Sequence, residues 1–285
     1  MSLKLYKEFL TTGSGTEGSV LIARTLAEPM VEEVEKAVLP RSLARRVWGP
    51  ADIPGSSIDV QKVDESSFNV WAVAEGASIP IGTQTYTNVN IKPKKYGVRP
   101  AITKEMLEDS KFPLLELNLR QAGRQLAYNE NSLVLTELDG AGNSVTGGAA
   151  ATVANVINGV QLVREDSYSP DTMLVGDEFL ADLMNIDTFT EADKWGSNEM
   201  QQKGIVGTIF GLNVIRFDLN AAPTTTYSKY CYIFDSKNAY DIAEKRPVSV
   251  QNWDDLVHDM SGLTVTQRVA IGLIRANAVC RVTTT

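Results

Sequence analysis

The side chains that most often carry catalysis or bind metals are sparse in this sequence. His258 is its single histidine, and the two cysteines, Cys231 and Cys280, lie far apart in the chain. A zinc site needs clustered Cys and His, and a serine or cysteine triad would have to recruit His258 without a G-x-S-x-G elbow or a family cysteine signature. A lone histidine among acidic residues, here WDDLVHDM, is usually structural or solvated. We therefore predict no catalytic residue, no metal site and no enzymatic activity.

Two further motifs also lack the features of a binding site. The glycine-rich stretch GAGNSVTGG at 140–148 lacks the Lys-Ser/Thr of a phosphate loop and follows a predicted helix instead of a strand. The pair Asp254 and Asp255 lacks the spacing of a calcium loop. Among 35 acidic residues, a pair of carboxylates can be proposed anywhere and so indicates nothing. No cofactor is predicted.

Charge and hydropathy exclude other classes of protein. The formal net charge is -8, and the basic pairs Arg45-Arg46 and Lys94-Lys95 are isolated, so recognition of nucleic acid through a basic face is disfavoured. No apolar run approaches the ~20 residues that span a bilayer, so no membrane association is predicted. The start MSLKLYKEFLTT lacks a secretory signal, and separated cysteines give no disulfide framework, which together favour an intracellular origin.

The elements that must position any functional surface begin with a stretch rich in Gly, Ser and Thr. Residues 1–26 are interpreted as an extended arm, and a short helix between two prolines is predicted at 28–38. Strand signals follow at 58–60, 68–73 and 85–92. Two strands joined by a long polar excursion predict a projecting hairpin, and excursions of this length tend to be functional.

The clearest predicted helix spans 114–138. An apolar stripe follows it, Pro113 precedes it and Gly140 lies just past its end. At ~1.5 Å per residue the helix is roughly 37 Å long, so it needs a sheet along its length. The face opposite the stripe carries charged residues, which are Glu116, Arg120, Arg124 and Glu130.

The C-terminal half is α/β in character. The small residues at 141–155 predict a linker. Helices are predicted at 156–163 and 177–184, and strands at 173–175, 212–217 and 230–234. The β-rich tail at 263–282 is predicted to return to the sheet under the long helix.

The order of motifs between Val73 and Asn143 resembles the major capsid proteins of tailed bacteriophages and related viruses, with the Hong Kong 97 type capsid fold. An A-E-x-A-x-x-P turn is present as Ala74, Glu75, Ala77 and Pro80. A T-x-x-x-V-x-x-K strand at 85–95, a short I-T-K-E-M-L-E-D-S helix at 102–110, the long helix and a glycine-rich exit follow in that family's order.

The resemblance implies an α+β fold with an N-terminal arm, an extended β-hairpin loop, a long spine helix packed on a β-sheet and an α/β axial domain. The expected boundaries are the arm at 1–26, a short helix and lead-in at 27–54, the extended loop at 55–84, the peripheral domain at 85–145 and 248–285 with its spine helix at 113–139, and the axial domain at 146–247.

The function implied is a structural major capsid protein. Its copies would self-assemble into hexamers and pentamers of an icosahedral or prolate shell around viral double-stranded DNA, without sequence-specific DNA binding. Possible partners are a separate scaffolding protein, a portal and decoration proteins, with assembly in the host cytoplasm and a final place in the virion capsid. The alternatives are an encapsulin-type nanocompartment shell protein and, less favoured, a soluble α+β enzyme or binding module.

Contacts between subunits are expected at large apolar or charged residues in and around the excursion. The candidates are Trp48, Lys62, Phe68, Trp71, Glu75, Ile79 and Arg99. For the aromatic and aliphatic candidates, packing within the subunit is the alternative. Some members of the family join subunits by an isopeptide bond from a loop lysine, but the matching position here is Gly76. We therefore predict subunits that are not covalently linked, with Lys62 as the only nearby amine.

Overall fold

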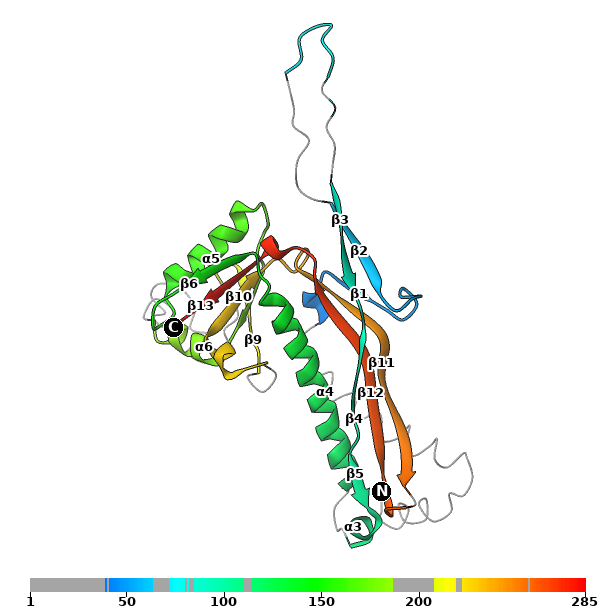
Figure 1. Cartoon of the computed structure of the whole chain (residues 1–285). Helices are drawn as coiled ribbons and strands as arrows, with labels where there is room; N and C mark the ends of the chain where they lie inside the picture. The colour runs from blue at the N-terminus through cyan, green and yellow to red at the C-terminus, as the bar shows by residue number, and fades with distance from the viewer. Residues whose placement is uncertain are drawn as a thin grey trace.

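The structure is a computed structural model that describes residues 39, 41–63, 72–79, 81, 85–109, 114–186, 208–218, 222–255 and 257–285. The arm at 1–26, the helix predicted at 28–38 and most of the strand predicted at 68–73 lie outside the described residues. Two larger sheets and one separate hairpin organise the rest (Figure 1).

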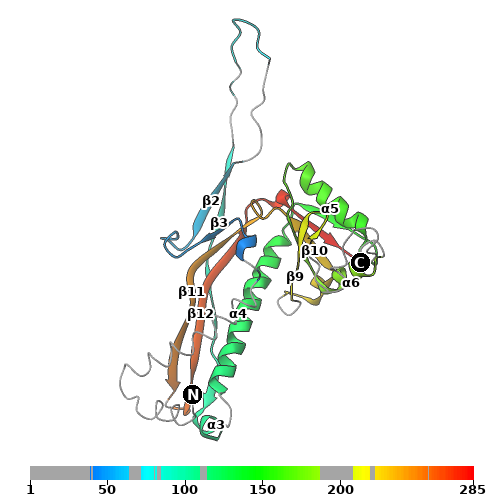
Figure 2. The ribbon, with the colours of Figure 1, turned by 180° about the vertical axis from the view of Figure 1, so that it is seen from behind.

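A five-stranded sheet supports the long helix. Its order is β1-β11-β12-β4, with β5 also paired to β12. The strands are β1 (Arg46–Trp48), β4 (Lys94–Val98), β5 (Ala101–Thr103), β11 (Tyr240–Asp255) and β12 (Met260–Leu273). The short helix α3 (Lys104–Asp109) follows β5, and β11 and β12 form a long antiparallel hairpin whose turn lies beside α3 (Figures 1 and 2).

The long helix α4 (Leu114–Leu138) has the bounds that the sequence predicted. Its apolar stripe packs on the sheet, because Leu119, Ala122 and Leu126 are buried against Leu263 and Val265 of β12. Figure 2 shows the helix running alongside the β11–β12 hairpin. On the opposite face, Arg120 pairs with Glu116 in solvent at 2.8 Å, as expected. Glu130, however, is 1% exposed, so its assignment to a polar outer face was wrong.

A six-stranded sheet forms the second unit. Its order is β6-β13-β10-β7-β9-β8. The strands are β6 (Asn143–Thr146), β7 (Thr172–Val175), β8 (Thr208–Ile209), β9 (Leu212–Arg216), β10 (Tyr230–Phe234) and β13 (Val279–Thr283). Among the described residues, the helices of this unit are α5 (Val153–Glu165) and α6 (Asp177–Met184), and the short 3-10 helices are η1 (Arg41–Leu43), η3 (Thr225–Lys229) and η4 (Ala276–Ala278).

Most predicted elements of this half are confirmed. Helices occupy 156–163 and 177–184, and strands occupy 173–175, 212–216 and 230–234. Two predictions were wrong. The segment 141–155, predicted as a linker or domain crossing, leads from α4 into the six-stranded sheet but contains the strand β6, and the end of the tail, β13, pairs with β10 and β6 instead of lying under α4. Cys280 and Val282 are fully buried, so β13 fills an interior position of the six-stranded sheet.

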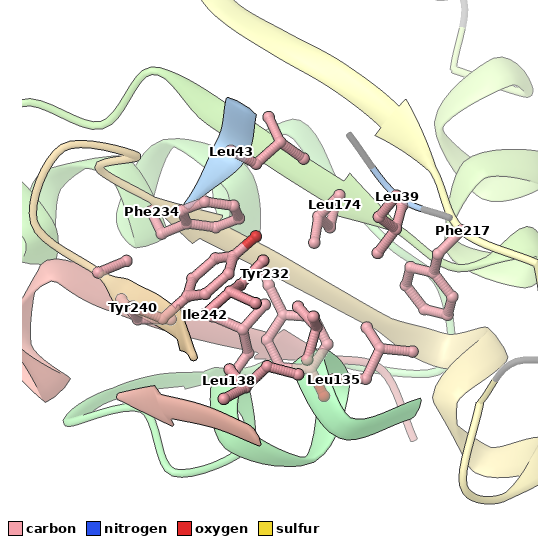
Figure 3. Close-up of a cluster of buried hydrophobic side chains, with 14 of the residues drawn as sticks. Leu39, Leu43, Leu135, Leu138, Leu174, Phe217, Tyr232, Phe234, Tyr240 and Ile242 are labelled. Carbon is pink, nitrogen blue, oxygen red and sulfur yellow. The ribbon is translucent and has the colours of Figure 1, made fainter. Parts of the chain in front are cut away.

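The two sheets share one hydrophobic core. Leu135 and Leu138 come from the end of α4, Leu174 and Tyr232 come from the six-stranded sheet, and Ile242 comes from β11 (Figure 3). All five are at most 2% exposed. Leu39 and Leu43 close the same cluster from the N-terminal side. The C-terminal end of the long helix therefore fixes the two units against each other.

A two-stranded antiparallel hairpin rises from the upper end of this assembly. Strand β2 (Ile58–Val63) pairs with β3 (Tyr86–Ile91) over their whole lengths. Strand β3 includes residues 86–91, which the sequence analysis assigned to the peripheral domain, so the hairpin extends beyond residue 84. In both views residues 72–79 lie beyond the ends of β2 and β3, away from the two sheets.

Candidate inter-subunit surface

The base of the hairpin is anchored on the five-stranded sheet by apolar contacts. Val60 of β2 and Ile91 of β3 are buried with Ala243 of β11 and Ile274, just after β12. Gly272 permits this approach, because a Cβ atom there would collide with the side chain of Ile91. The anchored base makes the hairpin a fixed extension of the subunit, so its direction is set by the sheet.

The distal part of the hairpin exposes apolar side chains. Ile79 is 75% exposed, Ile81 is 93% exposed and Tyr86 is 67% exposed. Glu75 is also exposed, in a turn closed by a 3.0 Å bond from the Ala77 backbone N–H to the carbonyl of Ala74. Burying isoleucine-sized side chains stabilises an assembly by about 1.5–3 kcal/mol each. Among the described residues, these three side chains are left exposed, which makes this surface a candidate contact.

Gly76, the position that the resemblance matches to a cross-linking lysine, lies in this turn. Its φ is +80°, in the left-handed region that glycine adopts without strain. A glycine therefore suits this turn, and it offers no amine. Lys62, the nearest alternative amine on the hairpin, is half-buried on β2 opposite Thr87.

Trp48 and Arg99 have partners within the subunit. The indole N–H of Trp48 donates to Oδ2 of Asp241 at 2.9 Å, and its ring lies 3.6 Å below the guanidinium of Arg46. Arg99 stacks on Trp253 of β11 at 3.6 Å. Phe68 and Trp71 lie outside the described residues. Among the seven candidates, Glu75 and Ile79 are therefore the described residues that lie exposed on the projecting tip.

Sequence reasoning missed a polar anchor that ties residues 39–48 to the body. Glu130 accepts two hydrogen bonds from Arg41, at 3.0 Å each, and a third from the Gln267 amide at 2.9 Å. Arg41 also donates to Glu244 at 2.9 Å. Burial opposes the charge of Arg41, but these carboxylates outweigh it and raise its pKa. The ion pair fixes the point where the chain enters the folded body.

A second ion pair repeats the arrangement nearer to β1. Asp241 is fully buried and accepts from Nε of Arg45 at 2.8 Å and from Trp48. The hydrogen bond with Asp241 raises the pKa of Arg45, although burial opposes it. The Arg45 backbone N–H donates to the carbonyl of Tyr240 at 2.9 Å. Sequence spacing gives no signal for partners 196 residues apart.

The histidine and the two cysteines, which could have supported chemistry, lie in surroundings typical of structural residues. His258 is exposed, and its Nδ1 lies 2.8 Å from Oδ2 of Asp255. Cys231 and Cys280 are buried free thiols, and burial raises the pKa of Cys280 to about 12. Within the described ranges, no three His, Cys, Asp or Glu side chains are grouped so that they could hold a metal ion. No helix in that same part of the chain is long and apolar enough to cross a membrane.

The fold and this surface define a class of protein: a shell-building subunit with a helix-on-sheet body and an extension that exposes apolar side chains. Comparison with known proteins identifies the family. The family model described as phage capsid protein matches residues 86–282, which is more than half of the 285-residue chain. The chain belongs to the phage capsid protein family. No curated protein matches it in sequence.

Solved structures agree with the family match. The mature capsid of bacteriophage PhiM1 is 13% identical, with a TM-score of 0.68 and 87% of each chain covered. The capsid of cyanophage P-SCSP1u is 14% identical, with a TM-score of 0.66 and 87% of this chain and 88% of that chain covered. A virus-like particle from Pyrococcus furiosus is 14% identical, with a TM-score of 0.61 and coverage of 92% and 99%. At these identities the likeness establishes the fold.

The chain is therefore a structural major capsid protein with the Hong Kong 97 type fold, and its place is the virion capsid. The family and fold imply a structural, non-enzymatic role. Copies of such a protein assemble into a capsid. The encapsulin alternative is not favoured, because the matching family is that of phage capsid proteins.

Proposed function

We propose that copies of this chain form hexamers and pentamers that close into an icosahedral or prolate shell around double-stranded DNA. The observation that supports this proposal is the projecting hairpin, whose tip exposes Ile79 at 75% and Ile81 at 93%. Surfaces of this kind gain burial only against another molecule, and in a homo-oligomer the natural partner is a second copy. In the proposed organisation the chain has an extended loop, a peripheral domain with the spine helix and an axial domain, and such assembly needs these three parts.

The inter-subunit contacts proposed for the loop are Glu75 and Ile79, with Lys62, Phe68 and Trp71 as further contacts. Trp48 and Arg99 are also proposed as inter-subunit contacts, because each is stacked on a neighbouring side chain. Their stacking on Arg46 and Trp253 prepares rigid surfaces at the edges of the sheet. Rigid aromatic and arginine side chains lose little entropy on binding and therefore concentrate binding energy.

The subunits of the proposed shell are held without covalent cross-links, because position 76 is glycine. Mature particles boiled in SDS should therefore run as a single band near 31.1 kDa. A ladder of multiples that survives boiling and reductant would contradict this, and Lys62→Arg would then test the one amine on the described strands of the hairpin.

The proposed partners are a separate scaffolding protein, a portal, decoration proteins and packaged DNA, with assembly in the host cytoplasm. The net charge of -8 supports a wall that holds DNA without binding its sequence. Purified shells should consequently bind unrelated DNA sequences of equal length with equal and weak affinity.

The first experiment is negative-stain electron microscopy with size-exclusion chromatography on the purified chain, alone and with a co-expressed scaffold. Closed shells, or rings of five and six, support the proposal, and shell diameter with nucleic-acid content separates a virion shell from a cargo compartment. Ile79→Asp combined with Ile81→Asp should abolish assembly, whereas Thr152→Asp on the axial domain, at an exposed cap, should not. A chain that stays monomeric under every condition would overturn the proposed assembly.

A further inference from the structure

Three cationic side chains lie in one row across the five-stranded sheet. Arg246 of β11 pairs in register with Arg268 of β12, and Arg268 pairs with Lys95 of β4. Directly paired residues of antiparallel strands share a face, and adjacent strands lie about 4.8 Å apart. The backbone positions of the three cationic residues therefore lie within about 10 Å of one another. We call Lys95, Arg246 and Arg268 the cationic row.

The cationic row faces away from the long helix. Val265 packs against α4 and Gln267 donates to Glu130 of the helix, so Arg268, one residue further along β12, points to the other face. The upper part of that outer face is covered by the base of the hairpin, where Ala270 packs with Ile91. Lys95 and Arg246, lower on the same face, are exposed.

No carboxylate in the described part of the chain forms an ion pair with the cationic row. Arg268 donates to the carbonyl oxygen of Pro93 at 3.4 Å, and its buried Nε has no hydrogen-bond partner. Like charges directly opposite each other destabilise a sheet, and a buried unsatisfied donor adds to that cost. An anionic partner would relieve both.

The far end of the same domain has the opposite charge. The turn of the β11–β12 hairpin and helix α3 carry six carboxylates but one lysine, Lys104. The acidic residues are Glu105, Glu108, Asp109, Asp254, Asp255 and Asp259. The hydrogen bond that Lys104 donates to Asp259, helped by the charges of Asp254 and Glu108, raises the pKa of Lys104. Val257 is 86% exposed and Met106 is 56% exposed among these charges. We call this end the acidic tip.

The acidic tip cannot neutralise the row of its own subunit. Eight residues of extended strand separate Arg268 from Met260, the first residue of β12 after the turn. At ~3.4 Å per residue the separation is about 27 Å. The screening length at physiological ionic strength is about 8 Å, so the two charged surfaces do not interact within one copy. Their complementarity can act only between copies.

We propose that the acidic tip of one copy docks on the cationic row of a neighbouring copy. This inference rests on the proposed shell function and names a contact of that shell. Because the two surfaces differ, the contact is head-to-tail, which closes into rings or continues across a curved lattice. Val257 at the centre of the tip supplies apolar burial, while the surrounding charges set orientation and partner choice.

The test is a charge swap followed by quantitative assembly. Lys95→Glu with Arg246→Glu takes the net charge from -8 to -12, since each change contributes -2. Glu105→Lys with Glu108→Lys takes it from -8 to -4 by two changes of +2. Both pairs of sites are exposed. Each double variant should raise the concentration of unassembled protein at equilibrium about tenfold, and the quadruple variant should restore it. A matched control, Arg164→Glu with Lys237→Glu, has the same charge as the row variant at exposed axial-domain sites.

The outcomes separate this contact from the wider proposal. If the wild type forms shells and the row variant assembles equally well, the proposed contact is overturned and the shell function is unaffected. Loss of assembly in both double variants without recovery in the quadruple variant would also overturn it, provided circular dichroism shows folded subunits. Recovery in the quadruple variant, with assembly of wild type weakening from 0.15 M to 1 M salt, is the expected result. A wild type that never assembles would contradict the proposed function itself.

Discussion

Replacing Arg41 by methionine should loosen the N-terminal segment while leaving the rest of the chain folded. Arg41→Met keeps the aliphatic stem but leaves the carboxylate of Glu130, 1% exposed, with Gln267 as its remaining partner. Removing one partner of a buried pair typically costs about 3–5 kcal/mol. Because the Arg41 side chain is 34% exposed, screening reduces this, and we expect about 2–3 kcal/mol.

The loss should appear first where the ion pair holds the chain. The backbone N–H of Leu39 donates to Asn131 on α4 at 2.9 Å, and that of Arg45 donates to Tyr240 at 2.9 Å. Hydrogen exchange read by mass spectrometry on unassembled protein should show faster exchange across 39–48 in Arg41→Met. Peptides from the six-stranded sheet should exchange at unchanged rates, because local opening precedes global unfolding.

A second variant isolates the cost of the unpaired charge. Arg41→Met with Glu130→Gln removes the buried charge and keeps an amide oxygen for Gln267, so it should recover at least half of the loss. Glu244→Gln, which leaves the Arg41–Glu130 pair intact, should cost about 1 kcal/mol or less. The reasoning is refuted if Arg41→Met changes the free energy of unfolding by less than 0.5 kcal/mol, roughly the size of a surface effect, or if the double variant is no more stable than the single one.

Three further predictions concern other parts of the chain. Gly262→Ala should lower the urea midpoint by the equivalent of about 1–3 kcal/mol, because the new methyl group would collide with the backbone carbonyl just before β5. Cys231 and Cys280 should resist Ellman's reagent until the protein unfolds. Burial raises both thiol pKa values above 9.0, so their contribution to stability is present below pH 9 and falls by about 1.4 kcal/mol per thiol per pH unit above it. The hydrogen bond from His258 lowers the pKa of Asp255, and NMR titration of His258→Ala should show that pKa rising.

The sequence predicted best those elements whose signal is local. The bounds of α4 followed from an apolar stripe between Pro113 and Gly140, and β10 followed from five consecutive strand-forming residues. Strand β13 was recognised as β-rich but placed in the wrong sheet. A strand buried on both faces has the same apolar character in either sheet, so its partner depends on long-range pairing that composition does not encode.

The candidate surface was predicted unevenly for the same reason. The excursion with Glu75 and Ile79 was identified because a long polar segment between two strands is a local pattern. The partners of Trp48 and Arg41 were not, since Asp241 and Glu130 lie 193 and 89 residues away. Glu130 was assigned to solvent because helical spacing places it off the apolar stripe. Its burial depends on an arginine that arrives from outside the helix.

A bulge in β11 makes two electrostatic arrangements compatible on one strand. The register shifts between Glu244 and Arg246, which pair with the consecutive residues Val269 and Arg268 of β12. In a strand without the bulge, positions 244 and 246 would share a face, because side chains alternate along a strand. The bulge instead lets Glu244 reach Arg41 on the helix side while Arg246 joins the cationic row on the outer side. The anchor within the subunit and the proposed contact between subunits therefore both depend on the bulge. A relative that keeps Glu244 and Arg246 two positions apart but pairs the residue between them in regular register must give up at least one of them.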